Sequence, residues 1–394
     1  MKKHLVLGAL AVLSLAACTK SEVVELNKGN EISLTAVTGK NLTKAADGFC
    51  NSAKPTSFDV WAATGGKTYF SKETYTLDGE SSTYKSASAR YWPNSPATVD
   101  FFAAKNYEGD SSPAPTPTFT PSAGATALAI DGYKVTTTVA SQKDFIYAVS
   151  KDVSKPAGGA AASLNFRHAL SQIEFQAMNS NPRIYVEVTG VAVKQVYSKG
   201  NFSVNVATTN NFVDHNFGAA DTDNRSGRCS WAGQGDKADY AITFDAVALK
   251  SVATSLSVKD PDGKEYNANT MYLIPQTVPD RWTVPTPTTP PTPPTPVPTT
   301  GKAYFEITAK IWNVAGDAVD KGNDVVLHDG KIAVPIPEST VWADGLRYVY
   351  TFNFTSYGTG GVEPGTGEPV LAPIELTVTV DDFVDAGDTD VEVK

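Results

Sequence analysis

Residues 348–354 read Tyr-Val-Tyr-Thr-Phe-Asn-Phe, with an aromatic ring at every second position. Alternation with a period of two places these rings on one face of an extended chain, which is typical of a half-buried β-strand. The same alternation recurs along the chain, in residues 58–62, 184–188, 304–308 and 374–380. No run of a dozen residues has helical spacing. We therefore expect short, peripheral helices and an all-β protein built from sandwiches of short strands.

The composition excludes several classes of protein. The chain has 394 residues, of which 41% are hydrophobic and 19% charged, with 30 Gly and 25 Pro. These values exclude a disordered chain and a coiled coil, and the length favours about two domains. The net charge is −9 and no stripe of Lys and Arg is present, so we expect no nucleic-acid partner. With three Cys and four His, the sequence also argues against a zinc module, and we predict no metal and no cofactor.

The amino terminus has the pattern of an export signal. Two lysines precede an apolar run of 13 residues, Leu5 to Ala17, which ends at Cys18. A helix needs roughly 20 residues to cross a bilayer, so the run is too short for a membrane span. Because small residues directly precede Cys18, we predict a lipoprotein signal peptide over residues 1–17 and lipidation of Cys18. The alternative is an ordinary signal peptide that ends in Cys.

The two other cysteines are Cys50 and Cys229. An exported compartment permits a disulfide between them, but sequence alone does not bring them together. Two unpaired cysteines are the interpretation that we favour, and the redox state stays open.

A change of register is predicted near Ser171 and Gln172. The larger apolar residues occupy even positions over residues 164–170 and odd positions over residues 173–177. A strand changes its buried face only where a residue is inserted, so we expect a bulge or a tight turn there. His168 shares a face with Phe166 and Leu170, and we predict a hydrogen-bonded structural role for it rather than a catalytic or metal-binding one.

Three segments near the carboxyl end have distinct compositions. Residues 284–299 form a Pro/Thr-rich stretch with eight prolines that favours polyproline II. It can be a linker, a surface loop or a glycosylated stalk, and we favour a loop inserted between two strands. A Gly-rich stretch, 358–369, then forms a tether to a strand predicted within residues 373–384. That strand alternates cleanly and, on a flexible tether, is suited to move from one molecule to another.

At this point a set of motifs resembles the fimbrillins of the Bacteroidales, which are type V pilins. The motifs follow the family order over nearly the whole chain, and together they are specific although each alone is weak. Besides the lipobox at Cys18 they are Tyr91-Trp92-Pro93, Asp100-Phe101-Phe102-Ala103-Ala104, Asn165-Phe166-Arg167-His168-Ala169-Leu170-Ser171-Gln172-Ile173, Ser198-Lys199-Gly200-Asn201-Phe202, Tyr272-Leu273-Ile274-Pro275-Gln276, Tyr348-Val349-Tyr350-Thr351-Phe352 and Val378-Thr379-Val380-Asp381-Asp382-Phe383.

The resemblance implies two transthyretin-like β-sandwich domains in tandem and export to the outer membrane as a lipoprotein precursor. It also implies cleavage by a trypsin-like protease and assembly with other fimbrial subunits at the cell surface. Thr43-Lys44-Ala45 stands where the family commonly has Thr-Arg-Ala, so we place the cut between Lys44 and Ala45. The expected divisions are a propeptide over residues 18–44, an N-terminal domain over 45–181 and a C-terminal domain over 182–394.

The residues before the cut have the pattern of a removable strand. Ile32, Leu34 and Ala36 alternate with Ser33, Thr35 and Val37, so this segment can be a strand, and its removal would leave an apolar groove with unpaired backbone groups. The carboxy-terminal strand of another subunit is the predicted donor. Its apolar face contributes about 6–12 kcal/mol of gross burial at roughly 1.5–3 kcal/mol per large aliphatic side chain. The donor residues are Ile374, Leu376, Val378 and Val380.

No catalytic signature is present: HExxH, GxSxG, CxxC and GxxxxGK[ST] are all absent. We therefore predict no catalytic residues. The tethered terminal strand, the removable strand and the family resemblance together imply a structural role in surface fimbriae that support adhesion. The competing hypothesis is a monomeric surface lipoprotein that binds glycans or a host protein through exposed aromatics such as Trp231 or Trp282. Within the fimbrial class, stalk, tip and anchor roles stay open, as does the adhesion receptor.

Overall fold

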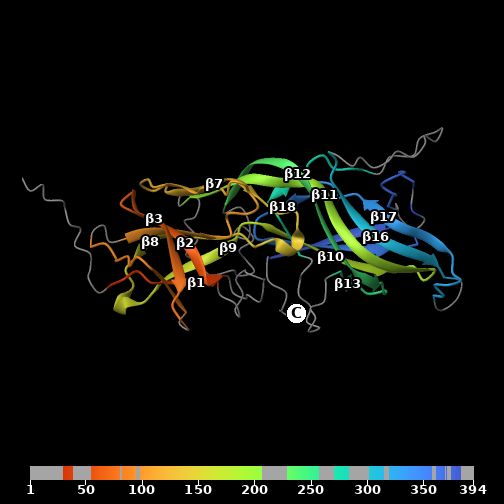
Figure 1. Ribbon diagram of the computed structural model, residues 1–394, viewed down its shortest axis with the longest axis horizontal. Helices are drawn as coiled ribbons and strands as arrows, with labels where there is room; N and C mark the ends of the chain where they lie inside the picture. The colour runs from red at the N-terminus through yellow and green to blue at the C-terminus, as the bar shows by residue number, and fades with distance from the viewer. Residues whose placement is uncertain are drawn as a thin grey trace, which may run out of the picture.

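The protein is described here from a computed structural model, which forms an elongated all-β molecule (Figure 1). The labelled strands β1, β2, β3 and β8 lie at one end, and β16 and β17 lie toward the other (Figure 1). The described residues are 30–38, 55–79, 82–94, 98–205, 229–256, 270–283, 301–314, 319–356, 361–368, 370 and 374–382.

Seven strands form a closed sheet in the order β1-β4-β3-β2-β5-β8-β9. Every neighbouring pair is antiparallel except that of β1 with β9, which is parallel. β1 thus closes the ring between β4 and β9. The strands are β1 Leu34–Thr38, β2 Ser57–Thr64, β3 Lys67–Leu77, β4 Thr83–Ser86, β5 Thr98–Lys105, β8 Ile146–Ser154 and β9 Ala162–His168.

Two larger sheets follow. One has the order β13-β10-β19-β20, with β14 beside β10, and the other has the order β17-β16-β11-β7-β6, with β12 beside β11. The strands of the first are β10 Ser171–Asn179, β13 Thr254–Ser255, β14 Met271–Leu273, β19 Leu346–Phe354 and β20 Ile374–Asp382. Those of the second are β6 Thr118–Thr120, β7 Ala127–Lys134, β11 Ile184–Asn205, β12 Ser230–Ala248, β16 Tyr304–Asn313 and β17 Val326–Val334.

The remaining elements are small. β15 Gln276–Thr277 pairs with β18 Val341–Trp342, and two 3₁₀ turns are present, η1 Val139–Ser141 and η2 Ala157–Gly159. Within the described ranges there is no α-helix, and thus no helix with the length and apolarity that a membrane crossing requires. The all-β prediction is confirmed, and so are the strands predicted around residues 58–62, 184–188, 304–308, 348–354 and 374–380.

The predicted change of register near residue 171 corresponds to a real break. β9 ends at His168 and β10 begins at Ser171, so the chain turns at Ala169 and Leu170, slightly earlier than expected. The turn is where the chain leaves the closed sheet and enters the next sheet. The register changes there because the two strands belong to different sheets, each with its own buried face.

The hydrophobic core is divided in the same way. One cluster fills the closed sheet and includes Phe58, Phe101, Leu164 and Phe166. A larger cluster holds the other sheets together and extends to Trp61 and other residues on the opposite face of the same strands. The closed sheet therefore has a core of its own, and any change to its ring of strands acts on that core directly.

A candidate strand-exchange site

The predicted removable strand lies at the centre of the closed sheet's core. Ile32, Leu34 and Ala36 are all buried. They belong to the cluster that also contains Tyr84 of β4 and Leu164 of β9, the two strands beside β1. Their alternation puts all three on the inner face, and Ser33 and Thr35 between them are only partly buried. The sequence therefore located the apolar face of this strand correctly.

The backbone of this segment is bonded on both sides. On one side β1 runs parallel to β9, from Leu34 opposite Ala162 to Thr38 opposite Phe166. The Ala162 N–H donates to the Ser33 carbonyl at 2.9 Å, and the Thr35 hydroxyl donates to the Ala162 carbonyl at 3.4 Å. Along this side, removal of the segment would leave the edge of β9 without a partner.

On the other side the segment pairs with two stretches of chain. Leu34 lies opposite Tyr84 in β4. Further toward the amino terminus, the Ile32 N–H donates to the Arg90 carbonyl at 2.6 Å and the Trp92 N–H donates to the Asn30 carbonyl at 3.2 Å. Residues 30–38 thus bridge two backbone edges and cover an apolar floor. Without them, the same place is a groove that suits an extended, alternating peptide strand.

The predicted donor strand occupies a very different position. β20 pairs along its whole length with β19, from Ile374 opposite Phe354 to Asp382 opposite Leu346, and it is the outermost strand of its sheet. Ile374 is buried and Leu376 is half-buried, whereas Val378 and Val380 are 42% and 49% exposed. The apolar face of β20 is therefore only partly used in its own sheet.

The described part of the Gly-rich stretch is attached to the body of the protein. Val362 is buried, and its backbone exchanges hydrogen bonds with Ala333 at the end of β17. Gly361 lies so close to the Ile332 side chain that a Cβ atom there would meet it at 2.1 Å. This glycine allows the chain to approach β17 closely, and it fixes the described part of the tether before β20 begins.

Several predicted positions lie outside the described residues. They include the lipidation site Cys18, the cleavage residues Lys44 and Ala45, Cys50 and the Pro/Thr-rich stretch 284–299. Cys229 is described: it is buried, and burial raises the pKa of its thiol well above the usual range. It is therefore a poor nucleophile in the folded protein.

The two tryptophans that the adhesin hypothesis requires are not exposed platforms. The Trp231 indole N–H donates to the Ala169 carbonyl at 2.8 Å, and its ring packs against Phe145 and Phe202. Trp282 is buried against Tyr304. Both rings serve internal packing, which removes the main support for glycan stacking at these positions.

His168 has the structural role that we predicted. Its Nδ1 lies 2.6 Å from Oδ2 of Asp144, a carboxylate that is fully buried. The pair links the end of β9 to the loop before β8, close to the turn at Ala169. Among the described side chains no cluster of three His, Cys, Asp or Glu is arranged to hold a metal ion.

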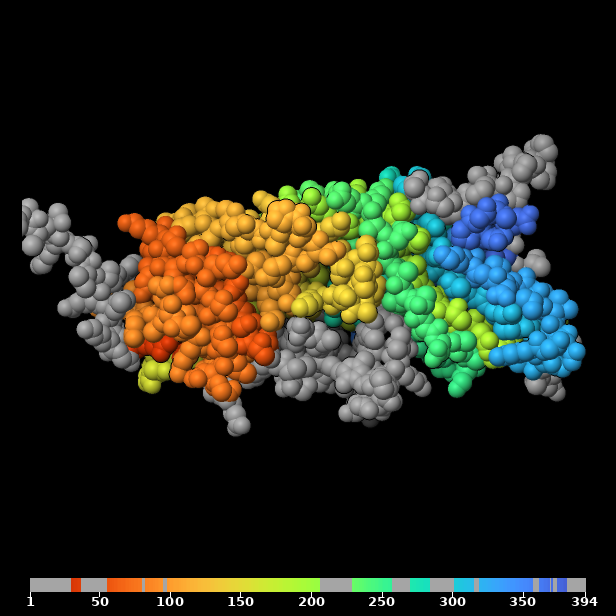
Figure 2. All heavy atoms as spheres, in the orientation of Figure 1, coloured from red at the N-terminus to blue at the C-terminus, as the bar shows by residue number. Residues whose placement is uncertain are grey.

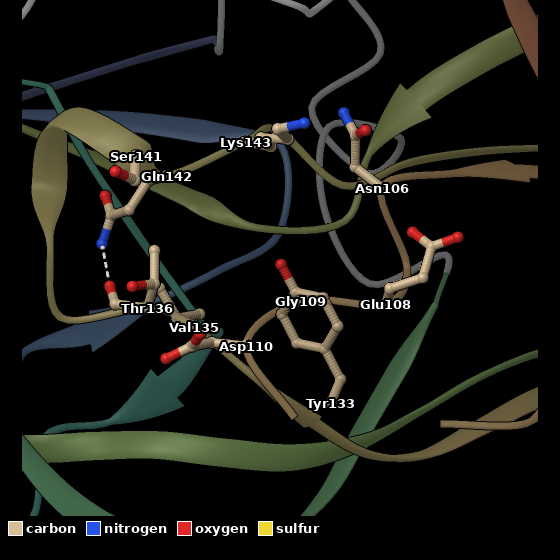
Figure 3. A pocket seen from close by; sticks show the side chains of 10 residues that line it. All are labelled: Asn106, Glu108, Gly109, Asp110, Tyr133, Val135, Thr136, Ser141, Gln142 and Lys143. Atoms are coloured by element: carbon tan, nitrogen blue, oxygen red, sulfur yellow. Dashed lines mark hydrogen bonds between the residues drawn. The ribbon is translucent and has the colours of Figure 1, made fainter. Parts of the chain in front are cut away.

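A cavity of about 250 Å³ lies beside η1, and both polar and apolar parts of residues such as Asn106, Tyr133 and Gln142 line it (Figure 3). The side-chain amide of Gln142 donates to the Thr136 carbonyl at 3.0 Å and accepts from the Tyr272 N–H at 2.8 Å. This amide thus ties the η1 loop to β14 instead of pointing a free donor or acceptor into the cavity. The cavity therefore has no assigned ligand.

The fold and the site define an all-β protein in which one strand, β1, closes a sheet and is buried on its inner face, while a second strand, β20, lies at a sheet edge. A fimbrial protein from Bacteroides vulgatus ATCC 8482 has a similar fold, with a TM-score of 0.54 and 13% identity over 90% of this chain and 99% of that one. A candidate cell adhesion protein from Bacteroides uniformis ATCC 8492 aligns with a TM-score of 0.43 and 12% identity over 90% and 100% of the two chains.

The family model described as fimbrillin-like matches residues 19–380. The chain therefore belongs to the fimbrillin-like family, as the sequence motifs indicated. Among curated proteins no match was found.

Proposed function

We propose that this protein is a structural subunit of surface fimbriae that polymerises by donor-strand exchange and supports adhesion. Membership of the fimbrillin-like family supports the fimbrial role at the cell surface and association with other fimbrial subunits. One observation carries the strand-exchange step: β1 closes the seven-strand sheet, and it lies in the segment that cleavage after Lys44 would release. Maturation would then open the sheet without touching any later residue.

In this proposal the precursor is exported as a lipoprotein, with lipid on Cys18 holding it at the outer membrane. While β1 is present, both edges of the groove are paired and the core is full, so the precursor cannot accept a strand. A trypsin-like protease cuts between Lys44 and Ala45 and releases the lipid anchor together with β1. The mature subunit then presents an empty groove with two unpaired edges.

The donor in this proposal is β20 of a neighbouring subunit, whose two exposed valines lack cover in their own sheet. The earlier estimate of about 6–12 kcal/mol counts four aliphatic side chains as fully exposed before exchange. Ile374 is already buried and Leu376 half-buried, so the net gain from the donor's side chains is smaller. In this proposal, the remaining free energy of assembly comes from the acceptor, because the donor strand covers the apolar side chains that line the empty groove.

We further propose the tandem arrangement of two transthyretin-like sandwiches, with domains over residues 45–181 and 182–394. The separate core inside the closed sheet supports an N-terminal unit, although β6, β7 and β10, which also precede residue 182, lie in sheets with strands of the C-terminal part. Without β1 the ring of this unit opens between β4 and β9, and a sheet with two free edges remains.

The test compares three precursors under limited trypsin cleavage: the native sequence, Lys44→Ala and Val378→Asp. The native chain should form heat-resistant oligomers after cleavage, and Lys44→Ala should stay monomeric with its amino-terminal segment attached. Val378→Asp should be cleaved but should not polymerise, because a carboxylate would enter the apolar groove. Val378 is 42% exposed, so this change leaves the monomer folded.

Two results would overturn the proposal. Equal polymerisation of Val378→Asp, or of a chain that lacks residues 373–394, would show that β20 is not the donor. A single-sized monomer after cleavage that binds a glycan saturably would favour the monomeric adhesin. Mass spectrometry of sheared filaments separates the fimbrial roles: an amino terminus at Ala45 indicates a stalk subunit, and an acylated Cys18 indicates an anchor.

A further inference from the structure

The removable strand and the terminal strand share a short sequence. Residues 32–36 read Ile-Ser-Leu-Thr-Ala, and residues 374–378 read Ile-Glu-Leu-Thr-Val. Three residues are identical, at the first, third and fourth positions. Two of them are inward apolar residues, isoleucine and leucine, and one is an outward threonine. The two segments belong to different sheets and do not pair with each other.

We propose that β20 of a second copy enters the groove in the same direction as β1, with Ile374, Leu376 and Val378 in the places of Ile32, Leu34 and Ala36. The donor then runs parallel to β9 and antiparallel to β4. This inference rests on the proposed strand exchange, and it adds the direction and register of the incoming strand.

Side-chain volume supports this register over its neighbours. Ala36 is the smallest of the three inward residues, and its site is buried in a full core. In the proposed register this site receives Val378. A slip by two residues in one direction puts Leu376 there instead, which overfills a packed site. A slip in the other direction puts Val378 in the place of Leu34 and leaves a void.

The same test argues against the reversed direction. A reversed strand centred on Val378 would place Val380, Val378 and Leu376 in the sites of Ile32, Leu34 and Ala36. Val378 then leaves a void at the site of Leu34, and Leu376 overfills the site of Ala36. The forward register instead retains Ile and Leu at two fully buried sites and adds only two methyl groups at the third.

Polar groups along the strand fit the same register. The Thr35 hydroxyl donates to the Ala162 carbonyl, and Thr377 brings an identical hydroxyl to that place. Pro373 falls on the position of Glu31. Between described residues, the bonds to Arg90 and Trp92 use the Ile32 N–H and the Asn30 carbonyl and not the Glu31 N–H. Proline, which has no N–H, therefore loses none of them.

Charge adds a further point of agreement. Leu34 lies opposite Tyr84 and Thr35 opposite Thr83. From this register we infer that Ser33 lies nearest to Lys85, before the pairing shifts to Glu31 opposite Tyr91. The donor replaces Ser33 with Glu375, so a carboxylate would face an exposed ammonium across the pair of strands. In the precursor Lys85 has Asp78 as an ion-pair partner at 2.7 Å.

Disulfide trapping against one acceptor position tests the register. Precursors with Cys18→Ser and Cys50→Ser would carry Lys85→Cys together with Glu375→Cys, Thr377→Cys or Thr379→Cys, and each would be cleaved by trypsin. All four positions are exposed, so the variants should fold. Opposed residues of antiparallel strands lie within disulfide reach, and residues two positions away do not.

We expect the Glu375→Cys chain to form disulfide-linked ladders between subunits at least about tenfold more efficiently than the other two, because only this pair is directly opposed. All three chains should polymerise equally under reducing conditions, which is the internal control. A dominant Thr377→Cys ladder would mean a slip by two residues, and a dominant Thr379→Cys ladder would mean a reversed strand. Either result overturns the register.

Failure of this inference is separable from failure of strand exchange itself. Polymers that form without any of the three cross-links would leave donor-strand exchange standing and would refute the register. A cross-link within single monomers would show that the chain fills its own groove, which refutes the second copy as occupant. No polymers from any cleaved chain would refute the proposed function, and the register with it.

Discussion

β1 and β20 carry the same inward residues at two positions, yet the protein holds them in opposite ways. β1 is paired on both sides and its inward residues are buried, but it lies in the segment that maturation is proposed to remove. β20 is paired on one side, and two of its valines are exposed, but it stays with the chain. In the proposed scheme, the precursor therefore carries a fully enclosed strand on the segment that cleavage would release and keeps a half-covered strand on the segment that stays.

The largest expected difference between the two strands is in stability. Leu34→Ala in the precursor should lower the free energy of unfolding of the closed sheet by about 2–5 kcal/mol, because it opens a cavity in a full core. The matched change Val378→Ala in β20 should cost less than about 1 kcal/mol, since the side chain is 42% exposed. Urea unfolding followed by far-UV circular dichroism, which reports the strands of all sheets, measures both.

If Leu34→Ala and Val378→Ala lowered the free energy of unfolding equally, β1 would be no more deeply packed than β20. Cleavage supplies the control: after Lys44 is cut and the released peptide removed, the native and Leu34→Ala chains are chemically identical and should unfold at the same urea concentration. A difference that persists would mean that the segment with β1 had not left the mature protein.

The second expected difference concerns the edges that each strand covers. After cleavage and removal of the released peptide, the amides of β9 and Trp92 that donate to residues 30–38 should exchange with solvent at least about 100-fold faster, because their acceptors are gone. Amides of β19 should keep their protection, since β10 and β20 stay in place on either side. Hydrogen exchange with mass spectrometry of the two sets of peptides measures this.

Polymerisation should restore protection to β9 in the same experiment. The uncleaved Lys44→Ala precursor, treated identically, should show slow exchange at β9 and β19 alike. Unchanged protection of β9 in the cleaved monomer would mean that the groove closes on itself, and the contrast between a fully enclosed strand and an edge strand would lose its functional meaning.

Local alternation was enough to predict both strands from the sequence. The inward positions of β1 and the whole extent of β20 follow from a period of two, which each segment carries by itself. The role of His168 also followed, because a histidine between apolar neighbours on a buried face needs a hydrogen-bond partner. That partner, Asp144, was missed, since it is 24 residues away and only the fold brings it close.

The arrangement of the strands could not be predicted from alternation. The ring that β1 closes depends on a parallel pairing with β9, whose residues lie more than 120 positions later. β11, which is 22 residues long, pairs with β7, β12 and β16 along its length, and a local pattern gives no sign of three partners. The alternation also did not predict that Val378 and Val380 are exposed in their own sheet, because burial depends on what covers a strand.

The smallest expected effect comes from one difference in charge between the aligned residues of β1 and β20. Ser33 in β1 is neutral, whereas Glu375 in β20 would face Lys85 in the polymer. Lys85→Glu should therefore weaken polymerisation of the cleaved chain by about 0.2–1 kcal/mol, a factor of roughly 1.4–5 in the assembly equilibrium. The precursor should tolerate the change, because Lys85 is exposed and its ion pair with Asp78 contributes little.

A charge swap makes this small effect decisive. Glu375→Lys alone should also weaken assembly, and the double variant with Lys85→Glu should recover most of the loss, since the opposed charges are restored with reversed sign. Salt should reduce the penalty of each single variant, because exposed charges are screened. Strictly additive losses in the double variant would place Glu375 away from Lys85. β1 and β20 would then share a sequence without sharing a place in the groove.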